Sequence, residues 1–134
     1  MANNYDQFSE MIHVPEDKKH AVIEFLAQWE TDINDGQFDF FGGIDVTFPY
    51  EDDGKTYLWL RAEESYMDEE LEYIVQGTLK AIDSDLPVTV SCAYTCSKMR
   101  PGEFGGGVYA IWKDRVEYAD GWTVINKLIK EDEE

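Results

Sequence analysis

The stretch IDVTFPYEDDGKTYLWLRA, residues 44–62, decides the fold because two strand patterns flank a tight-turn motif. Apolar and polar residues alternate from 44 to 50, which predicts a strand with one buried face. Asp53-Gly54 tolerates the positive φ angles that a two-residue hairpin turn requires. The return strand, residues 56–62, alternates again, with Tyr57, Trp59 and Arg61 on one face and Leu58, Leu60 and Ala62 on the other. Pro49 places the first strand at a sheet edge or near a strand end.

Helix patterns lie on both sides of this hairpin. Pro15 suits the first turn of a helix, and apolar residues recur at helical spacing after it. This pattern predicts a helix over 15–30, which is expected to end before the segment 32–36. A second helix is predicted over 67–82, with acidic residues crowding its first turns. Acidic side chains are favourable there because the N-terminal end of a helix carries partial positive charge.

The C-terminal half predicts more strands and one further helix. We expect strands over 87–96, 107–112 and 115–118, with a glycine-rich loop over 97–106. The last helix is expected to begin at Asp120-Gly121. Its apolar side is predicted to carry Trp122, Ile125, Leu128 and Ile129.

This order predicts an α+β two-layer sandwich. The antiparallel sheet is expected to have four to five strands, with two to three helices packed mainly on one face. A ferredoxin-like relative is one candidate arrangement, but strand order cannot be read from the pattern. We predict a single acidic domain over 1–130, followed by a solvated acidic tail over 131–134.

The residues of common catalytic and metal sites are sparse. His13 and His20 are the two histidines, and neither has a Ser or Cys beside it. Cys92 and Cys96 would lie roughly 13 Å apart on a strand, which is too far for a disulfide. A zinc site built on these two cysteines would need two more ligands. The glycine-rich segment 100–107 lacks the Gly-Lys-Ser/Thr of a phosphate-binding loop, and it could instead present Phe104 to a partner. We therefore predict no enzyme activity, no cofactor and no metal site.

The charge balance is the unusual property of this chain. There are 29 acidic residues against 11 Lys and Arg, for a net charge of −18. Residues 20–79 hold most of it, with 15 acids and two bases. Such a charge disfavours direct binding to nucleic acid or to an anionic membrane and favours cationic partners. No secretory signal and no long apolar run is present, so we expect a cytoplasmic location and no membrane span.

This asymmetry suggests a docking face for a basic partner. We hypothesise an inhibitor that mimics the charge of nucleic acid and blocks the site of a basic nucleic-acid-binding protein or complex, as phage- or mobile-element-encoded anti-CRISPR and anti-restriction proteins do. The partner-binding residues are predicted to be the acids around the hairpin and helix ends, with two aromatic contacts: Asp32, Asp35, Asp39, Asp45, Glu51, Asp52, Asp53, Glu63, Glu64, Asp68, Glu69, Glu72, Tyr57 and Trp59.

Three alternatives remain open at the level of sequence. An immunity or antitoxin-type protein would be acidic because its one nuclease toxin is basic. A small ligand-binding domain or enzyme could be acidic incidentally. The charge could also serve solubility alone. Competition with DNA for the partner would separate the first hypothesis from these three.

Overall fold

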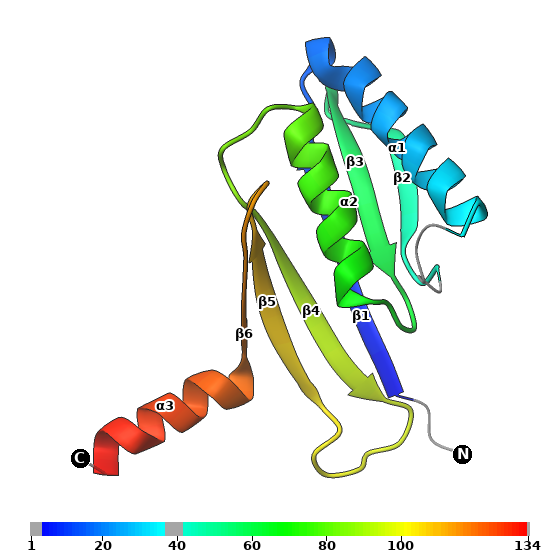
Figure 1. Cartoon of the computed structure of the whole chain (residues 1–134). Helices are drawn as coiled ribbons and strands as arrows, with labels where there is room; N and C mark the ends of the chain where they lie inside the picture. Colours follow the sequence, from blue (N-terminus) through cyan, green and yellow to red (C-terminus); the bar gives the residue numbers. More distant parts are fainter. Residues whose placement is uncertain (1–3, 37–41, 134) are drawn as a thin grey trace.

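The computed structural model describes residues 4–36 and 42–133. Its elements follow one another as strands and helices with a short 3-10 turn before the first helix (Figure 1). They are β1 (Asn4–His13), the 3-10 turn (Glu16–Lys18), α1 (Lys19–Asn34), β2 (Asp45–Asp52), β3 (Lys55–Ala62), α2 (Asp68–Ala81), β4 (Val88–Cys96), β5 (Gly105–Ile111), β6 (Val116–Asp120) and α3 (Gly121–Glu133).

The six strands form one sheet in the order β2-β3-β1-β4-β5-β6, and every neighbouring pair is antiparallel. β1 therefore lies inside the sheet, between β3 and β4. The elements from β1 to β4 form two interleaved β–α–β units, each with a helix as its crossover. β5 and β6 extend the sheet beyond β4, while β2 is an edge strand, which is one of the two positions that Pro49 predicted.

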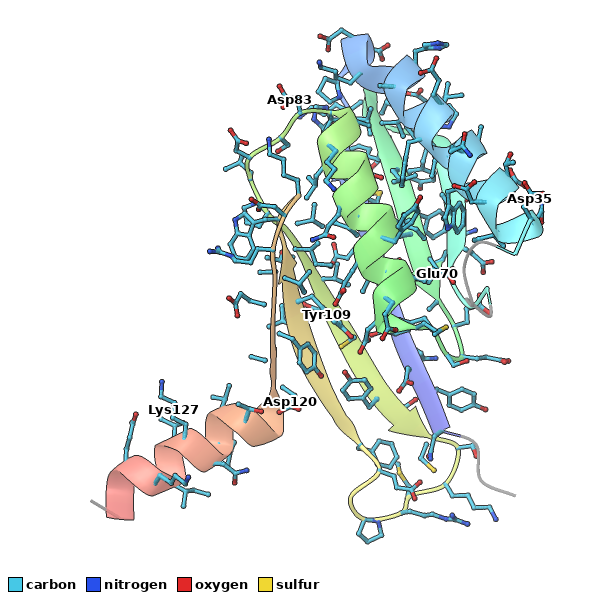
Figure 2. The ribbon with its side chains drawn as sticks, viewed as in Figure 1. Asp35, Glu70, Asp83, Tyr109, Asp120 and Lys127 are labelled. Carbon is cyan, nitrogen blue, oxygen red and sulfur yellow. The ribbon has the colours of Figure 1, made fainter. Side chains whose placement is uncertain are left out.

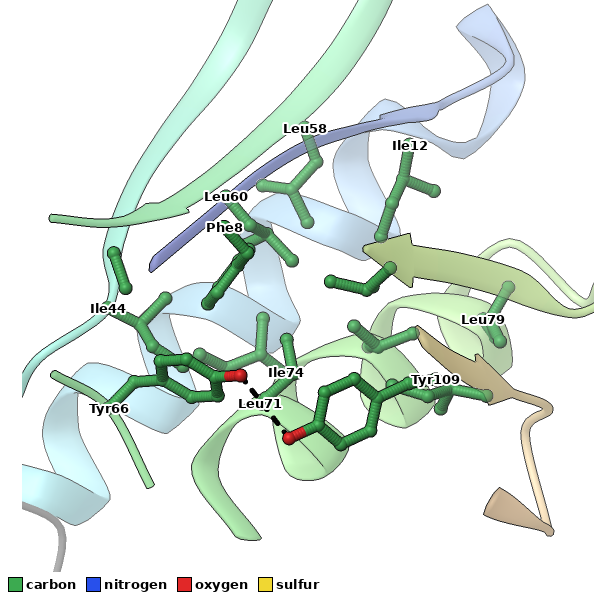
Figure 3. Close-up of a cluster of buried hydrophobic side chains, with 14 of the residues drawn as sticks. Phe8, Ile12, Ile44, Leu58, Leu60, Tyr66, Leu71, Ile74, Leu79 and Tyr109 are labelled. Carbon is green, nitrogen blue, oxygen red and sulfur yellow. Dashed lines mark hydrogen bonds between the residues drawn. The ribbon is translucent and has the colours of Figure 1, made fainter. Parts of the chain in front are cut away.

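Two layers make up the body of the molecule. α1 and α2 cover the same face of the sheet, whereas α3 projects away from the end of β6 (Figure 1). Figure 3 shows the core between the layers, built by alternate side chains of the strands and by the apolar stripe of α2. Leu58, Leu60, Leu71 and Ile74 are fully buried in it. We call the covered side of the sheet its inner face and the opposite side its outer face.

The central hairpin forms as the sequence predicts. Asp53 and Gly54 both have positive φ, 50° and 74°, which gives the turn the twist that neighbouring strands need. On β3, Thr56, Leu58, Leu60 and Ala62 are buried, and the residues between them are half-buried on the outer face. The α+β class and the antiparallel sheet are thus confirmed.

The predicted sheet size is wrong because β1 was missed. Paired residues on neighbouring strands share a face, so Asp6, Phe8, Glu10 and Ile12 lie on the inner face with Leu58 and Leu60. Two of these four inward positions are acidic. The apolar alternation that marks a strand is therefore absent from the sequence, although Phe8 and Ile12 are buried. A six-stranded sheet replaces the expected four to five strands.

Two helices differ from their predicted bounds. α1 continues to Asn34, past the expected end at residue 30, and Gly36 with φ 76° follows its last turn. α3 continues to Glu133, so residues 131–133 are helical where a tail was expected. The apolar residues of α3 do not pack on the sheet: Ile125, Leu128 and Ile129 are each about half exposed. The side chain of Trp122 lies outside the described part of the structure.

The close approach of α1 and α2 depends on Gly77. A Cβ atom at this position would lie 2.0 Å from Cζ of Phe25, whose ring also contacts Tyr73. Gly77→Ala is therefore expected to lower the free energy of unfolding by about 1–2 kcal/mol, although alanine favours helix by up to ~1 kcal/mol. Urea unfolding checks this. In a Phe25→Ala background the same change should stabilise; destabilisation there too would show that the ring is not the obstacle.

Candidate docking surface

Carboxylates gather at one end of the sandwich. α1 and α2 run in opposite directions, so the last turns of α1 lie at the same end as the first turns of α2 (Figure 1). The start of β2 and the segment after β3 reach this end too, because Asp45 pairs with Arg61 near the end of β3. We call this surface the acidic end and define it by Glu30, Asp32, Asp35, Asp45, Glu63, Glu64, Asp68, Glu69, Glu70 and Glu72.

Local structure holds these side chains in place. Asp68, Glu69 and Glu70 occupy the first turn of α2, where they stabilise the positive end of the helix. The backbone N–H of Asp6 donates to the carbonyl oxygen of Glu64 over 2.7 Å. The segment that carries Glu63 and Glu64 is thereby tied to β1. The charge of Asp32 contributes to a raised pKa of Tyr73, after the larger effect of burial, so the end of α1 lies close to α2.

The carboxylates of the acidic end form no ion pair in the part of the chain that the structure describes. Lys19 pairs with Glu16 and Glu51, and Lys113 pairs with Asp83 and Asp85, all away from this surface. Arg61 is the register partner of Asp45, but its guanidinium stacks 4.0 Å from the ring centre of Trp59 and donates to Thr47 Oγ1. None of the ion pairs within residues 4–36 and 42–133 involves a carboxylate of the acidic end.

The electrostatic consequence is visible in the pKa values. Burial, and then the charges of Asp68 and Glu69, raise the pKa of Glu72. By contrast, the ammonium group of Lys113 lowers the pKa of Asp85 at the other end of α2. A cation placed near Glu72 would offset the part of this rise that comes from the charges of Asp68 and Glu69.

Glu70 is the least satisfied member of the group. Its side chain is 1% exposed, and among the described residues no side chain donates a hydrogen bond to either oxygen. Burial raises its pKa, and the backbone of Gly42 offsets only part of that rise. Figure 2 shows Glu70 on the first turns of α2. A cavity of about 450 Å³ lies beside it, lined by apolar residues of α1 and β2 and by Glu30 and Asp45.

Glu70→Gln is expected to stabilise the protein. The raised pKa means that the folded chain ionises Glu70 less readily than the unfolded chain does, so the penalty is absent below the ordinary pKa near 4.5 and grows as pH rises through the raised value. The substitution should therefore add about 1–3 kcal/mol to the free energy of unfolding at pH 7 and almost nothing at pH 4. Denaturant unfolding at both pH values checks this. An equal gain at both would contradict the assignment.

The structure separates the hairpin turn from the acidic end. Glu51, Asp52 and Asp53 lie at the other end of β3, whose eight residues span roughly 25 Å. Glu51 is also engaged locally, because its carboxylate accepts hydrogen bonds from Thr56 Oγ1 and Lys19 Nζ. The predicted partner-binding acids therefore form two groups, and Asp39 lies outside the described residues.

The two predicted aromatic contacts lie on the outer face, not at the acidic end. Trp59 Nε1 donates to Ser9 Oγ over 2.9 Å, and its ring centre lies 5.2 Å from that of Tyr50. Together with Tyr57 and Met11 they line a shallow cavity of about 440 Å³. The outer face carries no helix among the described residues (Figure 1), so this aromatic surface is open to solvent.

A tyrosine cluster on the inner face was not predicted. Tyr66 and Tyr109 approach to 3.3 Å between hydroxyl oxygens (Figure 3), Tyr109 donates to Asp68, and Tyr94 and Tyr118 share a hydrogen bond. Burial is the largest cause that raises the pKa of all four hydroxyls, so they stay protonated at neutral pH. The cluster can donate hydrogen bonds but cannot act as a base. The sequence signal that could have indicated this cluster is the alternation of side chains along β4, β5 and β6.

Beside this cluster is a cavity of about 600 Å³ at the base of α3. Its walls come from the start of β1, the end of β4, the start of β5 and the first turn of α3. Phe104 and the acids Asp6, Glu103 and Asp120 contribute to the lining. Phe104 is half exposed, so the glycine-rich loop does present it to solvent.

Other groups offer less chemistry. Cys92 and Cys96 are buried free thiols. Within the described residues, no three His, Cys, Asp or Glu side chains are grouped to hold a metal ion. None of the described helices combines the length and apolar character that crossing a membrane requires.

Comparison with known proteins returned no similarity. No family model matches the chain, and no curated protein or solved structure resembles it significantly. Function is therefore inferred from the geometry and charge of this chain's own residues.

Proposed function

We propose that this protein is an inhibitor whose acidic end docks on the basic nucleic-acid-binding site of a partner protein or complex. The observation that carries the proposal is the acidic end itself, a surface of carboxylates without an ion pair in the described structure. Elsewhere on the molecule, lysines pair with exposed acids. A basic partner would supply the missing cations.

The physical basis is imitation of a polyanion. Duplex DNA presents about one negative charge per 1.7 Å of its axis, and proteins bind it mainly through Lys and Arg. The acidic end holds its carboxylates on helix ends and strand ends, so little backbone conformational entropy is lost when they meet such a surface. Complementary charge would speed association and select basic partners, and direct binding to nucleic acid is disfavoured.

Docking is expected to be linked to protonation. Burial is the largest cause of the raised pKa of Glu72, and the charges of Asp68 and Glu69 add to it; a lysine or arginine placed against Glu72 would lower this pKa by offsetting those charges. Complex formation at mildly acidic pH should therefore release protons. The same cations would also lower the free-energy cost of this charged surface in the folded protein.

Further parts of the proposal concern scaffold and location. We assign the elements from β1 to β4 to the ferredoxin-like arrangement, because the strand order β2-β3-β1-β4 with two crossover helices matches that pattern. We place the protein in the cytoplasm, where free thiols such as Cys92 and Cys96 are stable. No catalytic role forms part of the proposal.

Affinity capture tests the proposal. The tagged protein is incubated with host-type lysate at low salt and eluted first with duplex DNA and then with NaCl. Nucleic-acid-binding proteins released by the DNA step support mimicry. A single tight partner that resists DNA favours the immunity-type alternative, and the absence of any specific partner would leave solubility or a small ligand as the explanation.

A further inference from the structure

α3 carries an apolar stripe that its own chain does not cover. Val124, Ile125, Leu128 and Ile129 recur at helical spacing on one side and are 48–51% exposed. The helix projects away from the end of β6 (Figures 1 and 2), and its apolar residues are about half exposed. Four aliphatic side chains together on one helix are more than the scattered apolar exposure of an ordinary surface.

The helix is held in this position from its first turn. The carboxylate of Asp120 accepts a hydrogen bond of 2.7 Å from the backbone N–H of Thr123, which is an N-terminal cap. The cap also lowers the pKa of Asp120, so it persists at neutral pH. The cap ties the last residue of β6 to the first turn of α3.

α3 carries lysines along its apolar part and acids at its end. Residues 121–130 contain Lys127 and Lys130 and no acid, and Glu131, Asp132 and Glu133 follow them. The two lysines can pair with acids of a neighbouring surface. A partner for the stripe should therefore combine apolar area with negative charge.

The cavity at the base of α3 has those properties. Phe104, Tyr94 and Ile125 give it apolar walls, and Asp6, Glu103 and Asp120 give it negative charge. Oε2 of Glu103 is buried without a hydrogen-bond partner among the described residues. Because Ile125 belongs to both features, the cavity and the stripe form one continuous surface.

We propose that a second copy of this chain covers this surface, with α3 of each protomer seated in the cavity at the base of the other's α3. The contact is self-complementary, so a two-fold axis satisfies both stripes at once and leaves neither cavity open. The two α3 helices then lie side by side and antiparallel. Lys127 and Lys130 of each protomer approach the acids of its partner's cavity.

Sedimentation equilibrium of the full chain tests this directly. The expected result is a dimer at 100 µM, twice the monomer mass of 15.5 kDa. Leu128→Glu should shift the protein to monomer by weakening association at least 100-fold. Ile23→Glu is the matched control, because Ile23 is 47% exposed on α1 and should leave the dimer intact.

A second variant tests the cavity rather than the helix. Phe104→Asp places a charge in the wall of the cavity at a half-exposed position, and it should also weaken the dimer at least 10-fold. A wild-type monomer at 100 µM would overturn the proposal. So would a dimer that Leu128→Glu breaks but Phe104→Asp does not affect, because α3 would then be seated elsewhere.

Discussion

Reversing four exposed carboxylates of the acidic end is expected to weaken partner binding by at least about 100-fold, or roughly 2.7 kcal/mol. The variant combines Asp35→Lys, Glu63→Lys, Glu64→Lys and Glu69→Lys. All four side chains are exposed, so the fold should survive. Each change removes an attraction to the partner's cations and adds a repulsion, and repulsive contacts are costly at a charged interface. Calorimetric titration with the DNA-eluted partner measures the effect.

The matched control changes the same number of charges elsewhere. Asp17→Lys, Asp52→Lys, Asp114→Lys and Glu117→Lys alter the net charge by the same amount at exposed positions outside the acidic end. This control should weaken binding less than 10-fold, through long-range charge alone. Equal losses in both variants would mean that total charge, not the acidic end, attracts the partner.

Leu71→Ala is expected to cost 2–5 kcal/mol of the free energy of unfolding, as large-to-small changes in a core typically do. Leu71 is 0% exposed and lies in the α2 stripe that packs on the sheet (Figure 3). The sheet and the two covering helices share one core, so the cavity left behind cannot be filled from solvent. Urea unfolding at pH 7 measures the loss.

A leucine of the same chain provides the control. Leu86 precedes β4 and is 74% exposed, so Leu86→Ala should change the free energy of unfolding by less than about 0.5 kcal/mol. A loss below 1 kcal/mol for Leu71→Ala would contradict the assignment of the inner face. Such a result would mean that α2 does not pack on the sheet as described.

Local patterns were enough to predict most elements. The hairpin at 44–62 combines strand alternation with a turn whose backbone needs Asp53-Gly54, and both features are local. α2 runs over residues 68–81, close to the expected 67–82, because its apolar stripe is regular. Strand order could not be predicted, since it depends on pairing between residues far apart in the chain.

The features that the sequence did not predict have physical causes. β1 lies inside the sheet with Asp6 and Glu10 at inward positions, so its pattern resembled a polar terminus. Ile125, Leu128 and Ile129 lie on one side of α3 as predicted, but they are about half exposed because a stripe does not say what covers it.

The candidate site, too, could be predicted from the sequence only in part. Sequence indicated which segments carry the charge, but only the fold shows that Glu51 and Glu64 lie at opposite ends of β3.

Hydrogen exchange of the protein alone and in complex with its captured partner tests the central claim most directly. If the acidic end docks on the partner, backbone amides over 30–35 and 63–72 should exchange more slowly in the complex. Amides of the hairpin turn at 52–55 should be unchanged. Slower exchange confined to the hairpin turn or to the outer face, with the acidic end unaffected, would contradict the proposed docking surface.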